Sequence, residues 1–260
     1  MPVSDFIASL AARGRYHFAT GEAIQCGESS QGAVRAAIRR LKKKGLVATP
    51  YRGFHVIIPP EYRRIGCLPA EQFVPQLMDH LGLAYYGALL TAARYHGAAH
   101  QQPQVFQVMV TKNRPAIVCG DVRVAFVARR NTDRIPSILF NTPRGEIAVS
   151  SVEATAFDLV GYFKRAGGLD NVATVLGELS DAIEPKRLAE TAELSPKPWA
   201  QRLGYLLSLI GAASHADRLV RYLAGSTTET VPLDPGHEIS GASRDERWKV
   251  LVNVEVEPDL

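Results

Sequence analysis

The sequence predicts an α+β protein with two domains. An N-terminal winged helix-turn-helix over residues 1–60 precedes a larger mixed domain over 65–260, with a small antiparallel sheet and surrounding helices. Three observations predict this. The first sixty residues give helical periodicity three times and then a hairpin pattern, the segment 104–149 alternates like short strands, and helical spacing returns from residue 150. With 260 residues, 46% of them hydrophobic, the chain can form two cores.

Two helices are expected before residue 25. The first has one apolar face, formed by Val3, Phe6, Ile7 and Leu10. Gly14 ends it, and residues 16–19 are short and can extend. A brief helix over 20–24 follows, for which Thr20 is the expected N-cap.

A third helix is expected to begin at Ser29 or Ser30, either of which can act as its N-cap, and to run to about Lys44 before Gly45. Its apolar face consists of Val34, Ile38 and Leu41. Two successive helices with a tight connection indicate a helix-turn-helix. Two strands, 46–48 and 54–58, then form a hairpin, which after a recognition helix is a wing.

The segment 29–60 is strongly basic, although the net charge of the whole chain is only +4. The segment contains no Asp or Glu, and the rest of the chain is slightly acidic. A local basic surface is the usual electrostatic footprint of nucleic-acid binding. Its bases are Arg35, Arg39, Arg40, Lys42, Lys43, Lys44 and Arg52.

We expect the third helix to read DNA. Gln31 and Arg35 can reach base edges in the major groove, where Gln suits adenine and Arg suits guanine. Arg52 lies at the wing tip and can contact the DNA backbone or the minor groove. A solvated basic face on a protein-interaction module is the alternative, but the absence of acids favours DNA. In this helix, the basic residues after Arg35 are expected to contact phosphates. The remaining expected DNA contacts are Ser30, Arg39, Arg40, Lys42, Lys43, Lys44 and Tyr51.

The larger domain is expected to open with helices over 70–81 and 84–96. A strand over 104–111 and two hairpins then form the small antiparallel sheet. The hairpins turn at Gly120-Asp121 and at residues 142–145.

Helices dominate after residue 150. Ser150 and Glu153 form a capping box, with Ser150 as N-cap, that opens the first of them. Further helices are expected around 172–179, 195–210 and 213–223. After Gly225 the chain turns polar, and an alternating strand over 248–256 is expected to return to the sheet.

No enzyme site is evident in the sequence, and we expect no cofactor and no metal. His96 and His100 have helical spacing, but no third ligand accompanies them. Glu153 and Asp158 point in different directions on a helix. Phosphate-binding and nucleophile motifs are absent. The scattered thiols of Cys26, Cys67 and Cys119 suggest a reduced, cytoplasmic protein, and no signal peptide or membrane-spanning stretch is visible.

Three stretches resemble the AbiEi family of toxin–antitoxin regulators: LKKKGLVATPYRGFHVIIPPEYRRIG, LAYYGALLTAARYHGAAHQQPQVFQVMV and VSSVEATAFDLVGY. The second is the most specific, because many unrelated regulators share winged helices. The resemblance extends over about residues 4–224. It implies a winged-helix domain, a larger C-terminal domain and an antitoxin encoded beside a nucleotidyltransferase-like toxin. It also implies repression of its own operon at inverted repeats, and neutralisation of the toxin without a stable complex.

We therefore expect a non-enzymatic antitoxin and autorepressor that binds double-stranded operator DNA. The alternative is a ligand-responsive winged-helix transcription factor without an antitoxin role, which would need a pocket with convergent polar groups. A nuclease would need clustered carboxylates for a metal, and none is evident. A second DNA-binding surface could come from Arg63, Arg64, Arg129, Arg130 and Arg134.

Overall fold

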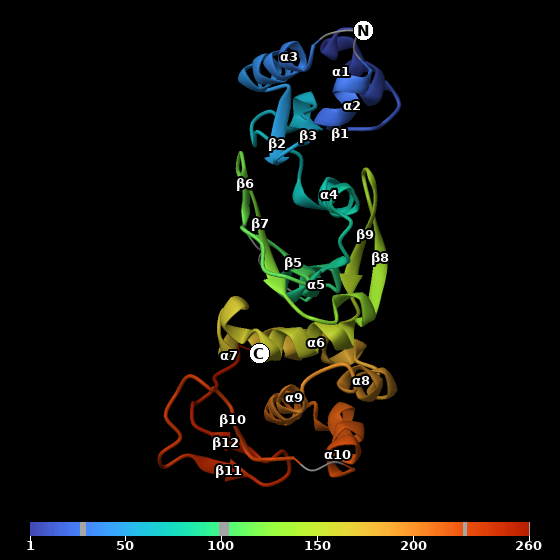
Figure 1. The fold of residues 1–260 in the computed structure, drawn as a ribbon. Coiled ribbons are helices and arrows are strands. Elements are labelled where there is room, and N and C mark those ends of the chain that lie inside the picture. The colour runs from blue at the N-terminus through green and yellow to red at the C-terminus, as the bar shows by residue number, and fades with distance from the viewer. Residues whose placement is uncertain (27–29, 99–103, 226–227, 260) are drawn as a thin grey trace. The chain divides into compact units, whose positions relative to one another are not determined.

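The computed structural model describes residues 1–26, 30–98, 104–225 and 228–259, and it confirms a mixed α and β protein (Figure 1). The chain packs into two compact units, each made of several segments. Unit 1 contains Met1–Tyr86, Gln104–Arg130 and Leu139–Ala148. Unit 2 contains Gly87–Pro103, Asn131–Ile138 and Val149–Leu260.

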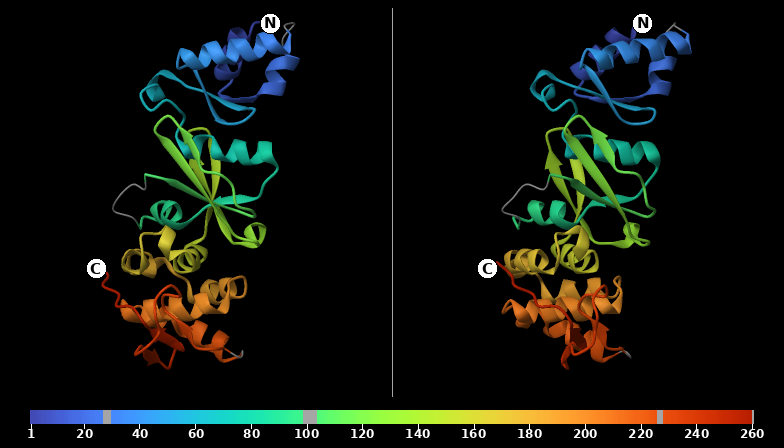
Figure 2. Two further views of the ribbon diagram at one scale, coloured as in Figure 1. Left: turned by 60° about the vertical axis from the view of Figure 1, so that its left-hand side comes forward. Right: turned by 90° about the vertical axis from the view of Figure 1, so that its left-hand side faces the viewer.

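The N-terminal part of unit 1 has three helices and a three-stranded antiparallel sheet with the order β1-β3-β2. The helices lie on one side of this sheet (Figures 1 and 2). In chain order the elements are α1 (Val3–Ala12), β1 (His17–Ala19), α2 (Thr20–Gln25), α3 (Gln31–Lys43), β2 (Val47–Tyr51) and β3 (Phe54–Ile57).

Apolar side chains from all these elements form one cluster, and they include the predicted face of α1. Phe18 and Val34 are completely buried in it. The predicted N-cap of α2 was wrong by one residue: Ala19 is the N-cap, and its backbone N–H donates to Glu22 Oε2 at 2.6 Å. The carboxylate of Glu22, three residues after the N-cap, therefore satisfies the N–H of the N-cap residue, as the acidic half of a capping box does.

A mixed six-stranded sheet follows, with the order β6-β7-β5-β4-β9-β8. The hairpin of β6 and β7 is antiparallel as predicted, but β5 pairs with β7 in parallel, and so does β4 with β9. The expectation of a purely antiparallel sheet was therefore wrong, because alternation predicts strands and not their partners. The strands are β4 (Tyr85–Gly87), β5 (Phe106–Val110), β6 (Ile117–Cys119), β7 (Val122–Ala128), β8 (Ser137–Thr142) and β9 (Gly145–Ser150).

The first two helices of the predicted larger domain differ from expectation in detail. The helix expected over 70–81 is a short 3₁₀ turn at Ala70–Gln72 and then α4 (Val74–Leu81). The helix expected over 84–96 starts late, because Tyr85–Gly87 is strand β4 and α5 covers only Leu89–Tyr95. Two adjacent tyrosines favour a strand over a helix, and the apolar pattern hid that preference.

Helices form most of unit 2: α6 (Val152–Gly161), α7 (Leu169–Leu179), α8 (Pro185–Ala192), α9 (Lys197–Leu209) and α10 (Asp217–Ala224). The capping box expected at the start of α6 was wrong. Ser151 is the N-cap, its Oγ accepting the N–H of Ala154 at 3.2 Å, and Glu153 Oε1 accepts the backbone N–H of Glu184 at 3.1 Å. Glu153 thus joins the start of α6 to the start of α8.

The C-terminal segment forms its own small sheet in unit 2. Strand β12 (Val250–Val252) lies between β10 (Val231–Pro232) and β11 (Ser243–Asp245). The expectation that the late strand joins the main sheet was therefore wrong. Trp248 anchors the segment, because it is 1% exposed and its Nε1–H donates to Ser208 Oγ of α9 at 2.9 Å.

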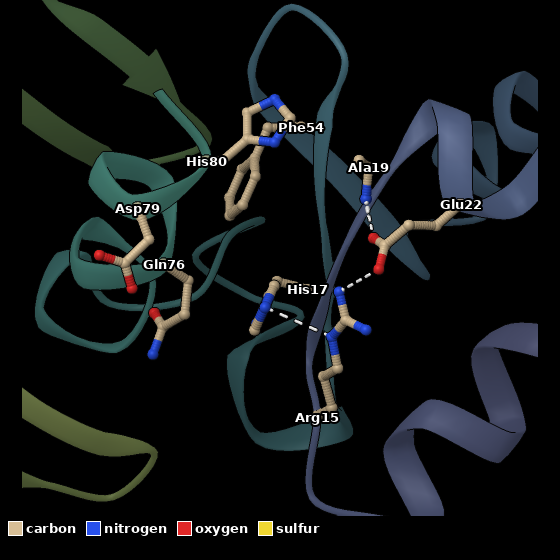
Figure 3. A pocket seen from close by; sticks show the side chains of 8 residues that line it. All are labelled: Arg15, His17, Ala19, Glu22, Phe54, Gln76, Asp79 and His80. Atoms are coloured by element: carbon tan, nitrogen blue, oxygen red, sulfur yellow. Dashed lines mark hydrogen bonds and ion pairs between the residues drawn. The ribbon is translucent and has the colours of Figure 1, made fainter. Parts of the chain in front are cut away.

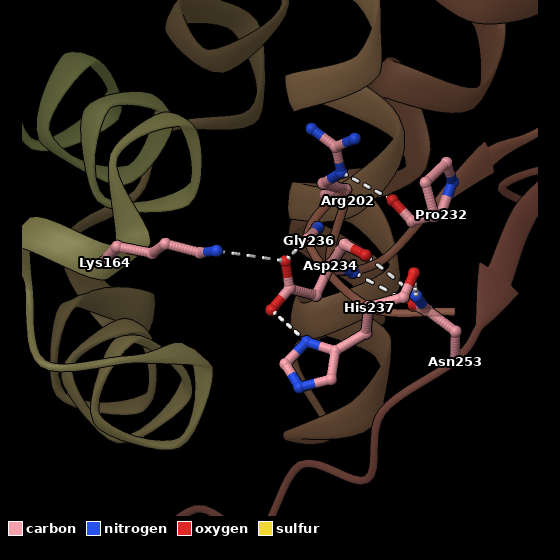
Figure 4. A network of polar contacts seen from close by, with 7 residues as sticks. All are labelled: Lys164, Arg202, Pro232, Asp234, Gly236, His237 and Asn253. Atoms are coloured by element: carbon pink, nitrogen blue, oxygen red, sulfur yellow. Dashed lines mark hydrogen bonds and ion pairs between the residues drawn. The ribbon is translucent and has the colours of Figure 1, made fainter. Parts of the chain in front are cut away.

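A buried carboxylate holds the loop that follows β10 (Figure 4). Asp234 accepts hydrogen bonds from the backbone N–H of Gly236 and from His237 Nδ1, both at 2.7 Å. Lys164 Nζ lies 3.8 Å from its Oδ1. Although burial favours the neutral acid, these hydrogen bonds and charges hold the pKa of Asp234 below its ordinary value.

The boundary predicted between residues 60 and 65 does not coincide with a boundary between the packing units. Phe54 and Val56 of β3 share a hydrophobic cluster with Phe73 and Leu77, and with Val108 of β5. The division of the chain at residues 60–65 therefore remains a prediction about which part performs which function. No helix in the described part of the chain is long and apolar enough to cross a membrane.

Candidate nucleic-acid interface

The site begins with α3, whose sequence explains its position. Ser30 is its N-cap and accepts the N–H of Ala33 at 3.3 Å, while Ser29, the other expected cap, lies outside the described residues. Val34 and Ile38 are 0% and 4% exposed and hold the helix against the N-terminal core. Gly45, with a φ of 66°, lets the chain turn back into β2.

The opposite side of α3 is exposed and cationic. Gln31, Arg35 and all the other predicted bases of the helix are exposed. Among the described residues, none of these bases forms an ion pair within 4.0 Å. Their charge is therefore available to an external anion, as DNA phosphates require. The exposed bases, which we call the basic face, are Arg35, Arg39, Arg40, Lys42, Lys43 and Lys44.

The hairpin after α3 turns tightly. Strand β2 reaches Tyr51, so the turn is only Arg52-Gly53, shorter than the predicted connection, and Gly53 has a φ of 83°. The Gly53 carbonyl accepts the backbone N–H of Thr20 at 2.9 Å, which holds the turn beside the start of α2. Arg52 is exposed there. Tyr51 is half-buried and packs on the core cluster, so its ring is less available for contact.

His55 is a buried polar link beneath this surface. It lies on β3, its Nε2 is 2.8 Å from Thr20 Oγ1, and its Nδ1 is 3.0 Å from Thr49 Oγ1. Burial and the nearby charge of Lys42 lower the pKa of His55 to about 4. The neutral imidazole therefore joins α2, β2 and β3 at physiological pH.

The second basic surface expected from the sequence is only partly available. Arg63, Arg64, Arg130 and Arg134 are exposed. Arg129 is 4% exposed, and its Nη1 lies 3.5 Å from the hydroxyl of Tyr86. A buried arginine cannot contact a nucleic acid, so including Arg129 in that surface was wrong.

Sequence spacing could not find a further group of mostly polar residues in unit 1. They come from β1 and Arg15 just before it, and from α2, β3 and α4, and they line a cavity of about 500 Å³ (Figure 3). Arg15 Nη2 lies 2.6 Å from Glu22 Oε1, and Arg15 Nε lies 3.3 Å from His17 Nε2. Because its members are distant in the chain, no linear pattern marks this group.

The histidine pair considered for a metal does not provide a site in the described structure. His96 Nε2 lies 2.7 Å from the carbonyl oxygen of Ser150, and His100 lies outside the described residues. Within the described ranges, no three His, Cys, Asp or Glu side chains are grouped so that they could hold a metal ion.

Comparison with known proteins identifies the segment that contains the six-stranded sheet and most of the helices of unit 2. Residues 85–209 match the model of the AbiEi antitoxin C-terminal domain. This match supports an AbiEi-type antitoxin family for the chain. The match begins at β4 and ends with α9, so it covers neither the basic face nor the C-terminal sheet.

Two further comparisons concern the whole chain. A crystal structure of the RV2827C protein from Mycobacterium tuberculosis is similar, with a TM-score of 0.69 and 15% sequence identity over 96% of this chain and 90% of that one. At this identity the likeness concerns the fold alone. No curated protein matches the chain. The AbiEi domain supports an antitoxin role, and an antitoxin implies a toxin as its functional partner.

Proposed function

We propose that this AbiEi-type protein is an antitoxin that also represses its own operon by binding operator DNA. In this proposal residues 1–60 act as a winged helix-turn-helix: α2 and α3 are the two helices of the motif, and the hairpin of β2 and β3 is the wing. The observation that carries the proposal is the basic face of α3, which is exposed and forms no ion pair among the described residues. The major groove of B-DNA is wide enough to admit an α-helix, and its phosphates attract the positive charge of this one.

The residues of α3 and of the hairpin turn have different roles in this proposal. Gln31 and Arg35 lie in the first turns of α3, where a recognition helix meets base edges. The bases from Arg39 onward hold phosphates and fix the position of the helix. Arg52, at the turn of the hairpin, contacts the DNA backbone or the minor groove.

Repression is steric. Two copies of the protein bind the halves of an inverted repeat and exclude the polymerase from the promoter. The second activity concerns the toxin, which we propose is nucleotidyltransferase-like and is counteracted without a stable complex. In this proposal the protein works in the cytoplasm and catalyses no reaction. The AbiEi domain over 85–209 supports the antitoxin half, and the charge of α3 supports the DNA-binding half.

Two alanine variants test the assignment of the helix. Arg35→Ala should weaken operator binding by about 1–3 kcal/mol and relax the preference at one base position. Lys43→Ala should weaken binding to every sequence about equally and reduce the salt slope by about one. Both are measured by fluorescence anisotropy on operator and scrambled duplexes, with the exposed Arg123→Ala as control. Equal losses on both duplexes for both variants would refute the division between base-reading and phosphate-holding residues.

A further inference from the structure

Two adjoining cavities in unit 1 lie beside β1. The larger, of about 500 Å³, is the one in Figure 3, and the smaller is about 190 Å³. Both are lined by Arg15, His17 and Gln76, so they are neighbouring parts of one groove. The larger volume is in the range of cavities that bind small molecules.

The smaller cavity is cationic, with Arg13, Arg15 and Arg144 in its lining and no carboxylate. Arg144 is held in place, since its guanidinium carbon lies 3.4 Å from the ring centre of Tyr16 and its Nε donates to Gln72 Oε1 at 2.8 Å. Guanidinium groups fixed in this way are suited to phosphate, which they can bind through paired hydrogen bonds.

The larger cavity is aromatic and has carboxylates in its lining. The ring of His17 lies 15° from parallel to that of Phe54, and the ring of His80 is 5.5 Å from Phe54. Glu22 is occupied by Ala19 and Arg15, as described above. Asp79 is exposed and its carboxylate accepts no hydrogen bond from any described residue, so the carboxylate can accept one from a ligand.

Gln76 stands where the two cavities meet. Its Nε2 donates to the carbonyl oxygen of Arg144 at 3.3 Å. Its Oε1 is buried and has no hydrogen-bond partner among the described residues. A buried acceptor without a donor is unfavourable, and Gln76 Oε1 gains a partner if its side chain turns toward a donor on a ligand in the cavity.

We propose that the two cavities form one binding site for a purine nucleotide. The phosphate lies between Arg13, Arg15 and Arg144, in a lining without carboxylates, and it competes with Glu22 for Arg15 and with Glu61, 3.7 Å from Arg144. The base lies in the larger cavity, where Asp79 and Gln76 accept hydrogen bonds from its N–H groups. Guanine is the better match, because its adjacent ring and amino N–H groups can both donate to one carboxylate.

Because of its position, ligand binding at this site can change DNA binding, an inference that rests on the proposed function. Arg15 pairs with Glu22, and Glu22 caps α2 through the N–H of Ala19. A phosphate competes with Glu22 for Arg15. Binding therefore alters the capping of α2, the helix that precedes α3, and with it the affinity for operator DNA.

Calorimetric titration of the full chain tests the site without DNA. The probes are GMP, inorganic phosphate and guanosine. GMP should bind one per chain, and each of the other two at least tenfold more weakly. Arg15→Gln and Asp79→Asn should each weaken GMP binding at least tenfold, while Arg123→Ala, an exposed base on β7 outside the lining, should not. Because the carboxylate of Asp79 has no hydrogen bond among the described residues, its variant should fold normally, which thermal unfolding checks.

Absence of saturable GMP binding, or GMP binding of normal strength in both lining variants, would overturn the site. Phosphate binding as tightly as GMP would also overturn it as a nucleotide site. Operator anisotropy with and without GMP then tests the coupling, which predicts at least a threefold change in affinity for the wild type and none for Asp79→Asn. An unchanged operator affinity refutes the coupling alone. If the protein without GMP shows no preference for operator DNA, the proposed function is refuted. The calorimetric titration alone then decides whether the nucleotide site exists.

Discussion

At the scale of single residues, His55 gives the N-terminal part a sensitivity to pH. It is 6% exposed and bonded to Thr20 and Thr49, and its pKa is lowered from 6.5 to about 4. Between these two values the unfolded chain binds a proton that the folded chain does not. The stabilisation is therefore complete above pH 6.5 and is lost as the pH falls toward 4.

The expected result is a loss of about 2 kcal/mol in the free energy of unfolding between pH 7 and pH 5, from His55 alone. The lowered pKa values of Glu22 and Asp234 act only below about pH 4.5, so they do not interfere. The pKa of His17 is also lowered, by burial and by the charge of Arg15, so His17 adds to the loss in the same pH range. Urea unfolding at both pH values measures it. His55→Gln, which can still bond to the threonines, should lose most of this dependence, and the exposed His80→Gln should keep it. An unchanged dependence in His55→Gln would contradict the assignment.

At the scale of elements, α3 contains a glycine that its own packing does not require. A side chain at Gly32 would meet only Ser30 Oγ, at 4.0 Å. Glycine costs a helix about 0.5–1 kcal/mol relative to alanine. The residue is exposed and lies on the side of α3 opposite Val34, where the proposed contact with DNA would bring a partner close to the helix.

Gly32→Ala should therefore raise the free energy of unfolding by about 0.5–1 kcal/mol. It should also weaken operator binding about tenfold, because the added methyl group lies between the helix and the bases. Gly21→Ala in α2 is the control for stability, since open space surrounds that position too. If Gly32→Ala bound the operator as tightly as the wild type, α3 would not approach DNA along this face.

Elements also mark the limit of prediction from sequence. Helical periodicity correctly placed α1, α3 and α7, and turn residues placed the hairpin of β6 and β7. Pairing between distant strands, such as β5 with β7, leaves no local signal. The basic face was predictable because its residues share one helix. The cavity beside β1 was not, since its residues meet only through folding.

At the scale of the whole molecule, the chain exceeds the AbiEi domain at both ends. Beyond residue 209, the C-terminal segment is fixed to α9 by Trp248, which lies so close to Gly204 that a side chain there would clash with its ring. Gln201 Nε2 donates to the carbonyl oxygens of Glu229, Trp248 and Lys249. The polar composition of the segment did not predict this attachment, because its contacts come from single residues far apart in the chain, such as Gln201 and Trp248.

The packing of the N-terminal part decides whether the two proposed activities can be tested on separate fragments. Cutting the chain between residues 60 and 65 would divide the cluster that Phe54 and Val56 share with Phe73. Fragments are therefore a poor test of independent functions, and variants of exposed residues such as Arg35 and Lys43 are better. These variants keep every core contact while removing charge from the basic face.

The most direct test of the central claim is fluorescence anisotropy of the full-length protein on the DNA upstream of its own gene, across a salt series. We expect clear preference for that duplex over a scrambled one, and a slope of log affinity against log salt of about −5 per chain. Weak binding that is indifferent to sequence would contradict the account. The basic face would then be only an electrostatic surface, and the repressor function would have to be withdrawn.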